Sequence, residues 1–311
     1  MQFKKIIRRD FLSLREIHYK ITAAEAGLMI EPFLKKIHNY SSRTIVKLKH
    51  YPEGIRLNGV HARTVDILKE NDDLCITFLD NDSNLDNYIR CEIPVEICYE
   101  DDDIMVYNKP PFMPCHQSIG HPADTLANVF ANYCDKIGKK LMYRPLNRLD
   151  RDTTGAVLIA KNRFAAASIT GGFNKIYRAI VCGVPQPLEG RIDLPIRREA
   201  EEEMRRIVAE DGQRAVTNYK VISHNQNYSL VDFTLETGRT HQIRVHMSHI
   251  GYPLIGDPMY GEESSLINRQ ALHCAKIAFK QPVSGEDLLI NCPLPDDMLE
   301  LCEKFNLQIP D

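Results

Sequence analysis

The sequence predicts an α+β protein whose larger part is built on a mixed, largely antiparallel sheet. The first observation is that strand-like apolar runs outnumber helical segments beyond residue 98. The second is that helices and strands do not alternate regularly, which argues against a doubly wound parallel sheet. The expected strands are 104–107, 156–160, 177–184, 230–235 and 272–279, and the expected helices are 125–137 and 162–170.

Length and composition divide the chain of 311 residues into two domains. Residues 82–97 are polar and acidic, so we expect a linker there, between a small α/β module at 1–81 and a larger domain at 98–311. Within the module, 31–37 and 42–49 have the pattern of short helices. Asn58-Gly59 lies between apolar residues, which is typical of a tight β-hairpin.

Composition also narrows the class of protein. The hydrophobic fraction of 43% is ordinary for a globular protein, and no apolar stretch approaches the ~18 residues of a membrane span. The first residues lack the apolar segment of a signal peptide, so we expect a cytoplasmic protein, by default a monomer. The nine cysteines never form a Cys-x-x-Cys pair, which argues against a disulfide framework or a thiolate zinc site.

The net charge of -3 conceals an asymmetry along the chain. Residues 1–80 hold 14 Lys and Arg against 10 Asp and Glu, whereas 81–103 hold one Arg against eight acids. The basic N-terminal segment could contact the phosphates of a nucleic acid, although a solvated face explains such a density equally well. Charge alone therefore leaves an RNA partner open.

The segment around Asp150 is the most informative part of the sequence. Asp150 lies between Arg148 and Arg151, directly before an apolar run, and the flanking cations favour its charged form. We expect Gly155 to let the backbone pass close to a bound ligand. The arrangement predicts an active-site loop, and a solvated charged turn is the alternative.

Two further segments carry candidate site residues. In 235–246 a strand is expected to end at Gly238 and a helix to begin near Thr240, where Arg239 could pair with Asp150. In Lys175-Ile-Tyr177 a basic and an aromatic residue share one face of a strand. Together these residues describe a site that stacks on a flat ring beside a carboxylate, although Tyr177 alone is typical of core packing.

Five blocks of the sequence resemble, in order, those of the RluA family of RNA pseudouridine synthases. The blocks are 100–111, 148–155 (Arg-Leu-Asp-Arg-Asp-Thr-Thr-Gly), 175–177, 237–246 (Thr-Gly-Arg-Thr-His-Gln-Ile-Arg-Val-His) and 251–261. They span nearly all of 98–298. The N-terminal region is similar to the alpha-L RNA-binding motif that often precedes this catalytic domain, through 41–44 and 55–60.

The resemblance implies that uracil is detached from its ribose, rotated and rejoined through carbon 5, without cofactor or metal. It implies that Asp150 is the catalytic carboxylate, acting as nucleophile or as base, with Arg239 as its charge partner. Tyr177 would stack on the base and assist proton removal from carbon 5, and Arg148 would fill the gap left by the flipped nucleotide. Further substrate contacts are expected at Leu149, Lys175, Thr240, Gln242, Ile243 and Arg244, and contacts of the N-terminal module with RNA at Ser42, Arg43, Lys47, Arg56 and Asn58. The implied substrate is ribosomal RNA, with transfer RNA as the alternative.

Three residues depart from the family pattern, and two other functions are compatible with parts of the sequence. Asn147 stands where the family often has histidine, Thr154 where it has serine, and Phe112 where it has glycine. Asp150 and Asp152 form an Asp-x-Asp pair, so a magnesium-dependent transferase is one alternative, although no phosphate-binding Gly-rich loop accompanies it. A non-catalytic RNA-binding protein that keeps a synthase fold is the other. The spacing of five residues between the two histidines of 241–246 does not suit a helical zinc site.

Overall fold

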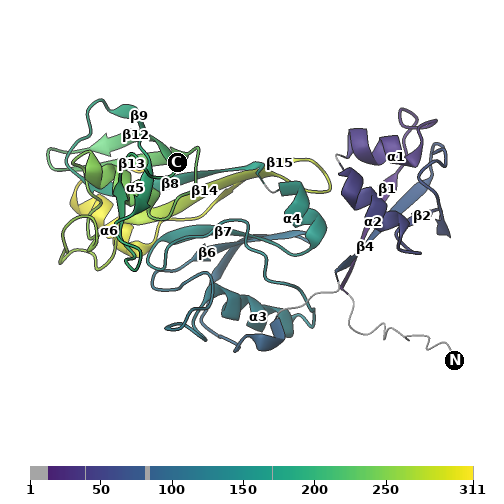
Figure 1. Cartoon of the computed structure of the whole chain (residues 1–311), viewed down its shortest axis with the longest axis horizontal. Coiled ribbons are helices and arrows are strands. Elements are labelled where there is room, and N and C mark those ends of the chain that lie inside the picture. The colour runs from purple at the N-terminus through teal and green to yellow at the C-terminus, as the bar shows by residue number, and fades with distance from the viewer. Residues whose placement is uncertain (1–12, 39, 81–84, 170, 311) are drawn as a thin grey trace.

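The structure is a computed structural model that describes residues 13–38, 40–80, 85–169 and 171–310 (Figure 1). The ends of the predicted module, the start of the predicted linker and the last residue of the predicted helix 162–170 lie outside these residues. Figure 1 shows a small N-terminal module, purple to blue, beside a larger domain that runs from teal to yellow. No helix in the described ranges is long and apolar enough to cross a membrane.

Nine strands form the main sheet of the larger domain, and every pairing described in it except one is antiparallel. Their spatial order is β5 (Glu96–Glu100), β6 (Ile104–Lys109), β7 (Thr154–Ala160), β14 (Leu272–Lys280), β8 (Phe173–Cys182), β13 (Tyr228–Leu235), β12 (Val216–His224) and β9 (Glu189–Asp193), with β15 (Asp287–Asn291) paired to β14. The exception is the parallel pairing of β7 with β14. The predicted α+β fold with a mixed, largely antiparallel sheet is confirmed.

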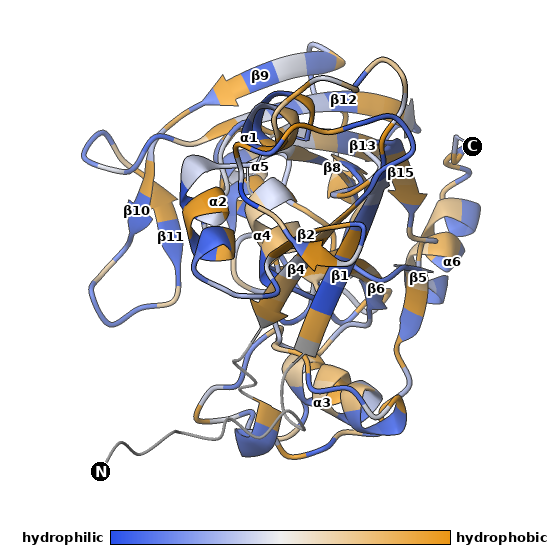
Figure 2. Ribbon diagram, turned by 90° about the vertical axis from the view of Figure 1, so that its right-hand side faces the viewer, coloured by the Kyte–Doolittle hydropathy of each residue, from blue (hydrophilic) through white to orange (hydrophobic). Residues whose placement is uncertain are grey.

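Four helices accompany this sheet: α3 (Leu126–Lys136), α4 (Arg163–Ile169), α5 (Gln242–His249) and α6 (Asp296–Lys304). The first two lie at the predicted positions, α5 begins two residues after its expected start, and α6 was not predicted. Thr125 begins α3 because its hydroxyl accepts the backbone N–H of Asn128, whose side chain in turn accepts the N–H of Thr125. A separate two-stranded hairpin, β10 (Ile196–Arg198) and β11 (Arg206–Val208), extends to one side of the main sheet (Figure 2).

The core of the larger domain forms around β7. All seven residues of β7 are buried, as expected of a continuous apolar run that is covered on both faces. Phe130 from α3 and Ile169 from α4 belong to the same buried cluster, which continues into β6, β8 and β14. Figure 2 shows hydrophobic residues, in orange, recurring along α3 and α4. The loop that carries Asp150 directly precedes this buried strand, which anchors one end of the loop in the core.

Gly155 brings the backbones of two strands close together. Its φ of +106° is open to glycine, and an added Cβ would lie 2.3 Å from the carbonyl oxygen of Cys274. The close approach therefore joins the beginning of β7 to the backbone of β14, and the expected approach of this backbone to a ligand stays a prediction. The sequence correctly indicated a close contact at this glycine, but it gave no information on which segment makes it.

The N-terminal module has its own sheet and core. Its strands are β1 (Ser13–Lys20), β4 (Asp73–Asp80), β2 (Ile55–Leu57) and β3 (Val60–His61) in spatial order, with α1 (Ile30–Pro32) continued by a π-helical turn (Phe33–Ile37), and α2 (Ser42–Lys49). The predicted helices and hairpin are confirmed, since Asn58 and Gly59 adopt positive φ at the turn between β2 and β3. Ile30, Phe33 and Leu34 are among its fully buried side chains.

The described part of the predicted linker packs on the larger domain. A short 3₁₀ turn, Leu85–Asn87, begins it, and Leu85 and Cys91 are buried in the core of the larger domain. Arg90 bonds to both carboxylate oxygens of Asp135, at 2.6 and 3.1 Å. The described part of the predicted linker therefore runs along the larger domain and does not span a gap between two domains. Its last residues already belong to β5.

Candidate active site

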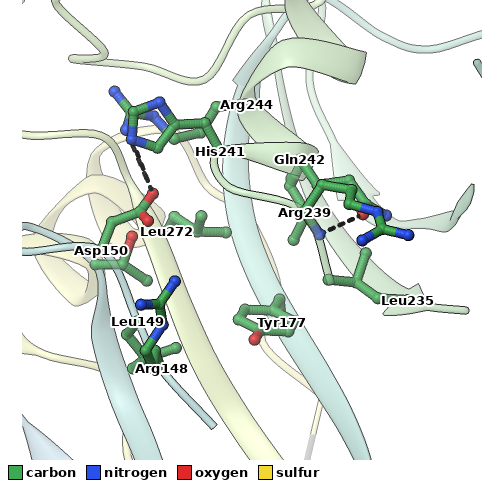
Figure 3. Close-up of a pocket in the computed structure, with 12 residues that line it drawn as sticks. Arg148, Leu149, Asp150, Tyr177, Leu235, Arg239, His241, Gln242, Arg244 and Leu272 are labelled. Atoms are coloured by element: carbon green, nitrogen blue, oxygen red, sulfur yellow. Dashed lines mark hydrogen bonds and ion pairs between the residues drawn. The ribbon is translucent and has the colours of Figure 1, made fainter. Parts of the chain in front are cut away.

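Asp150 lies in a cavity between the loop before β7, the middle of β8 and the chain that enters α5 (Figure 3). The cavity has a volume of about 640 Å³, and a smaller adjoining hollow of about 70 Å³ reaches toward α5. Both are lined by Arg148, Leu149, Asp150, Tyr177, Leu235 and Arg239. A cavity of this size fits a nucleotide-sized ligand.

The loop that carries Asp150 is fixed by buried contacts on both sides of the residue. The N–H of Thr153 donates to the carbonyl of Asp150 at 3.1 Å and closes a turn. The N–H of Leu149 donates to the sulfur of Cys115 at 3.4 Å, and the ammonium group of Lys109 donates to the carbonyl of Arg151 at 2.9 Å. The side chain of Asp150 remains 29% exposed, so it is held in place yet open to the cavity.

The charge partner of Asp150 is Arg244, from the first turn of α5. Its Nη1 lies 3.4 Å from Oδ2 of Asp150, while Nε and Nη2 bond to the two oxygens of Asp257 at 2.7 and 2.8 Å. Burial lowers the pKa of Arg244, but its bonds and charges with Asp257 and Asp150 raise it above the usual value overall. Arg244 therefore remains a cation beside Asp150.

The predicted pairing of Asp150 with Arg239 is wrong. Arg239 is exposed, its Nε donates to the carbonyl of Arg214 at 3.1 Å, and Figure 3 shows its guanidinium directed away from Asp150. The reason is the start of α5, which falls at Gln242 rather than near Thr240. Arg239 thus lies in the preceding loop, whereas Arg244, the third residue of α5, faces the carboxylate.

Gln242 shapes this loop from the inside. Its side chain is buried, accepts the N–H of Arg239 at 2.9 Å and donates to the carbonyl of Val216 at 2.9 Å. Gln242 therefore has a structural role, because these bonds tie the loop after β13 to the start of β12, and its expected contact with substrate stays a prediction. Ile243 is also buried and lines the smaller hollow, and Thr240 lines the larger cavity.

His241 is a site residue that the sequence analysis did not single out. It caps α5 in the left-handed conformation, with φ 58°, a strained geometry for histidine. Its Nε2 lies 3.8 Å from Asp150, and its Nδ1 lies 2.8 Å from the hydroxyl of Tyr260. Burial lowers the pKa of His241, so the ring is neutral at neutral pH. The signal for His241 in the sequence is its place in the block 237–246, where its spacing from the second histidine was considered only for a zinc site.

Tyr177 and Lys175 come from β8, where their positions two apart place them on one face. Tyr177 is buried in the cavity wall, and burial raises the pKa of its hydroxyl well above the usual value. The ammonium nitrogen of Lys175 lies 6.0 Å from the centre of the Tyr177 ring, and burial lowers the pKa of Lys175. Figure 3 shows the Tyr177 ring below and to the right of Asp150, facing the loop that carries Asp150.

Arg148 and Leu149 occupy opposite environments on the same loop. Arg148 is exposed at the cavity, as a side chain must be to enter a space left by an extruded nucleotide, whereas Leu149 is buried. Asn147, one residue before, donates to the carbonyl of Ala156 at 2.9 Å and accepts the N–H of Leu158 at 2.9 Å. The departure at Asn147 therefore serves to attach the loop to β7.

The residues expected to contact RNA in the N-terminal module fall into two groups. Arg43 and Lys47 are exposed on α2 and line a cleft, and Ser42 is exposed at the start of the same helix. Asn58 instead holds the hairpin turn, where its side chain donates to Asp72 at 2.8 Å and accepts the N–H of Asp73 at 2.9 Å. Arg56 donates to Glu16 and to the sulfur of Cys75.

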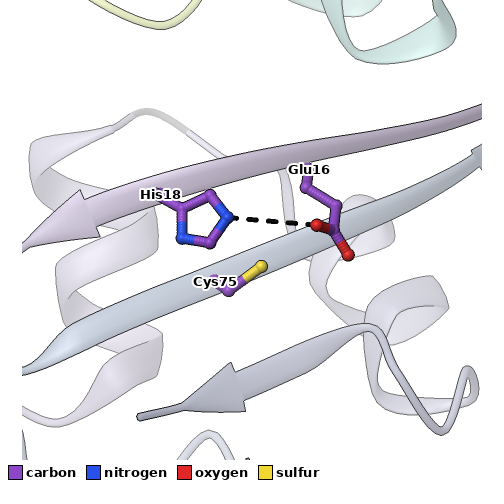
Figure 4. A group of neighbouring side chains, drawn as sticks. All are labelled: Glu16, His18 and Cys75. Atoms are coloured by element: carbon purple, nitrogen blue, oxygen red, sulfur yellow. Dashed lines mark ion pairs between the residues drawn. The ribbon is translucent and has the colours of Figure 1, made fainter. Parts of the chain in front are cut away.

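Glu16, His18 and Cys75 form the one group of three potential metal ligands found among the described residues (Figure 4). The guanidinium of Arg56 already supplies a cation to this group, through its bonds to Glu16 and Cys75.

In the loop that carries Asp150, Asp152 accepts two bonds from Arg151, at 2.6 and 3.0 Å. Each carboxylate of the Asp-x-Asp pair therefore has its own arginine, which disfavours the magnesium-dependent alternative.

Comparison with known proteins gives a consistent result. The family model described as RNA pseudouridylate synthase matches residues 103–249. The uncharacterized RNA pseudouridine synthase YjbO of Bacillus subtilis is 37% identical over 271 residues, which cover 86% of this chain and 95% of that protein. Ribosomal large subunit pseudouridine synthase D of Zymomonas mobilis is 39% identical over 227 residues, which cover 67% of this chain and 71% of that protein.

Solved structures share the fold. Human RNA Pseudouridylate Synthase Domain Containing 4 superimposes with a TM-score of 0.57 at 25% identity, covering 69% of this chain and 94% of that chain. Human RNA Pseudouridylate Synthase Domain Containing 1 has a TM-score of 0.52 at 24% identity and covers 70% of this chain and 97% of that chain. The chain therefore belongs to the RNA pseudouridine synthases, in the RluA family, and is an isomerase that acts on RNA.

Proposed function

We propose that this enzyme isomerises specific uridines of ribosomal RNA to pseudouridine, with Asp150 as the catalytic carboxylate. The observation that carries the proposal is the position of Asp150, open to the cavity and 3.4 Å from the buried cation of Arg244. A carboxylate so placed can stabilise, or bond to, the ribose carbon that becomes positively charged when its bond to the base breaks.

The reaction balances without an external reagent. The bond between ribose carbon 1′ and uracil nitrogen 1 breaks, the base turns, and a new bond forms between carbon 1′ and carbon 5. Carbon 5 then loses a proton, and nitrogen 1 gains one. Asp150 interacts with carbon 1′ in the first step, or it removes a ribose proton there and returns it when carbon 1′ bonds to carbon 5. Both roles need the negative charge that Arg244 stabilises.

Tyr177 is proposed to hold the base by stacking and to take part in the last proton transfer. Because its raised pKa keeps the hydroxyl protonated at neutral pH, the group would act as a hydrogen-bonding relay rather than as a phenolate. Lys175, Thr240, Ile243 and Arg244 complete the wall around the base, and Gln242 and Arg239 shape the loop above it. Arg148 is proposed to occupy the space left by the extruded nucleotide.

The RNA partner is supported by similarity and by charge. One relative is named ribosomal large subunit pseudouridine synthase D, which favours ribosomal RNA over transfer RNA. We further propose that residues 1–81 form an alpha-L-type RNA-binding module, that 98–311 form the catalytic domain, and that the enzyme works as a monomer in the cytoplasm, without metal or cofactor. Arg43 and Lys47, both exposed on α2, are the part of the module best placed to contact RNA.

Pseudouridine mapping tests the proposal. Total RNA from cells with and without this gene would be treated with carbodiimide, and the resulting reverse-transcription stops compared. We expect one or more stops in ribosomal RNA to vanish on deletion and to return with the wild-type gene but not with Asp150→Asn. A stop restored by Asp150→Asn would exclude Asp150 as the catalytic carboxylate. An unchanged pattern would favour a non-catalytic RNA-binding protein.

A further inference from the structure

An ion pair connects the N-terminal module to the larger domain. Arg15 of β1 donates from Nε and Nη2 to the two carboxylate oxygens of Asp103, both at 2.8 Å. Asp103 is completely buried and also accepts a bond from the side chain of Asn162 at 2.8 Å. A two-point arginine contact with a buried acid fixes orientation as well as distance.

An aromatic contact reinforces this connection. Phe164 of α4 is buried and belongs to the hydrophobic core of the module rather than to that of its own domain. Its ring stacks on Phe78 of β4 with centres 4.9 Å apart, and it lies 5.1 Å from the ring of Tyr40. The module is therefore docked on α4 through apolar burial and an ion pair, and Figure 1 shows α4 as the helix that faces it.

A cleft of about 540 Å³ opens at this junction, between α2 and β4 on one side and α4 on the other. Its open apolar surface comes from Tyr51, Phe78 and Leu79, which are partly exposed, and the buried side chains of Leu48 and Phe164 lie beneath them. Three cations line it: Arg43 and Lys47 from α2, and Arg163 from α4. No acidic residue lines this cleft within the part of the chain that the structure describes.

We infer that this cleft binds an unpaired nucleotide of the substrate RNA, at a second site built jointly by the module and the catalytic domain. The inference rests on the proposed function for the identity of the substrate. Apolar and aromatic side chains accept the face of a base, while lysine and arginine contact the adjoining phosphates. The volume suits one nucleotide, and the absence of acids among the described residues that line the cleft suits a polyanion.

A second contact, at the junction of the module and the catalytic domain, adds to the affinity for RNA and restricts its orientation. Because the RNA is then bound at two points, its affinity exceeds that of the active site alone, and its orientation relative to Asp150 is restricted. The contact is made equally before and during the reaction. Its loss therefore weakens binding and raises KM, with kcat unchanged.

Charge reversal on both walls of the cleft tests the inference. The variants are Lys47→Glu from the module and Arg163→Glu from the catalytic domain, and Lys49→Glu is the matched control, because Lys49 lies on the same helix but pairs with Glu31. The probe is a large-subunit ribosomal RNA transcript substituted with 4-thiouridine. We expect Kd to rise at least tenfold for both cleft variants and less than twofold for the control. The slope of log Kd against log salt should fall by about one for each phosphate contact removed.

Photo-crosslinking of the same transcript locates the contact directly. We expect crosslinks to residues 41–51 and 163–167 in the wild-type protein. Crosslinks absent from both segments, or an Arg163→Glu variant that binds like the control, would overturn the composite site. Loss of binding in the cleft variants, together with an unchanged pseudouridine pattern in cells that lack the gene, would support the RNA site and overturn the proposed function instead. A melting temperature equal to that of wild type excludes unfolding as the cause.

Discussion

Arg244 is fixed by Asp257, and this contact determines which of its nitrogens faces the catalytic candidate. Asp257 is completely buried and takes Nε and Nη2 of the guanidinium at 2.7 and 2.8 Å. Nη1 is thereby directed at Asp150, 3.4 Å away. Asp257 also accepts the backbone N–H groups of Met259 and Tyr260, so the position of the arginine is set by a turn in a distant part of the chain.

The first prediction concerns Asp257→Asn. The substitution keeps the shape of the side chain but leaves the charge of Arg244 without its buried partner, and breaking a buried ion pair costs about 3–5 kcal/mol. We expect a lower free energy of unfolding and a single-turnover rate that falls by roughly 10²-fold, because the guanidinium is no longer aimed at Asp150. Denaturant unfolding and pseudouridine formation under single-turnover conditions measure the two effects.

A control for Asp257→Asn is Asp211→Asn, which removes the exposed partner of Arg197, 2.8 Å away. A surface pair of this kind contributes about 0–1 kcal/mol, so stability and rate should stay close to those of wild type. Equal effects of the two substitutions would contradict the role assigned to Asp257.

The sequence determined most local structure because local structure depends on nearby residues. The helix 42–49 was predicted with the observed bounds. Its signals are local, because the residue that caps it, Ser41, directly precedes it and the apolar spacing lies within it. The parallel pairing of β7 with β14 could not be predicted, because it joins segments more than a hundred residues apart. The docking of Phe164 into the module core depends on the same kind of distant contact.

Within the site, the sequence correctly brought Asp150, Tyr177 and the loop before α5 to one cavity. It assigned the wrong arginine, because Arg239 lies in the loop before α5, where its guanidinium bonds to the carbonyl of Arg214, 25 residues away, and no local pattern shows that contact. The contributions of Lys109, Cys115 and Asp257 were not recognised. Each acts by fixing a catalytic segment from a distant position, and no local pattern reveals such a contact.

A second prediction separates the two proposed roles of Tyr177. Tyr177→Phe keeps the ring and removes the hydroxyl, so the Kd for RNA should not change. If the hydroxyl relays the proton from carbon 5, the rate of tritium release from uridine labelled at carbon 5 should fall roughly 10²–10⁴-fold. Tyr219→Phe, which removes a hydroxyl bonded to the carbonyl of Pro187, is the control. Normal tritium release in Tyr177→Phe would limit Tyr177 to stacking.

A third prediction concerns Lys109, which donates to the carbonyls of Pro110, Met113 and Arg151. Burial lowers the pKa of Lys109 from 10.5 to about 8. Between these values the unfolded chain binds a proton that the folded chain has released, so this group makes folding more favourable as pH rises. Relative to Lys109→Met, the free energy of unfolding of wild type should grow by about 2 kcal/mol from pH 7 to 9.5.

Denaturant titrations of both proteins at the two pH values measure this difference. A difference that stays constant with pH would show that Lys109 keeps its ordinary pKa in the folded protein. Activity should move in the opposite direction, because a neutral amine has two hydrogens for three carbonyls and holds the Asp150 loop less firmly. The rate of wild type should therefore decline above about pH 8, a decline that Lys109→Met, already slow at pH 7, should not show.

The last prediction concerns Gly155, where β7 begins directly after the Asp150 loop. Gly155→Ala adds a Cβ that would lie 2.3 Å from the carbonyl oxygen of Cys274, at a φ of +106° that alanine rarely adopts. Because backbone must move on one side, we expect a loss of about 3 kcal/mol or more of stability and a displaced Asp150 loop with a lower kcat. Gly120→Ala is the control, since nothing lies within 4 Å of its added Cβ. If Gly155→Ala unfolds with the midpoint of wild type, the contact between β7 and β14 does not hold the loop in place.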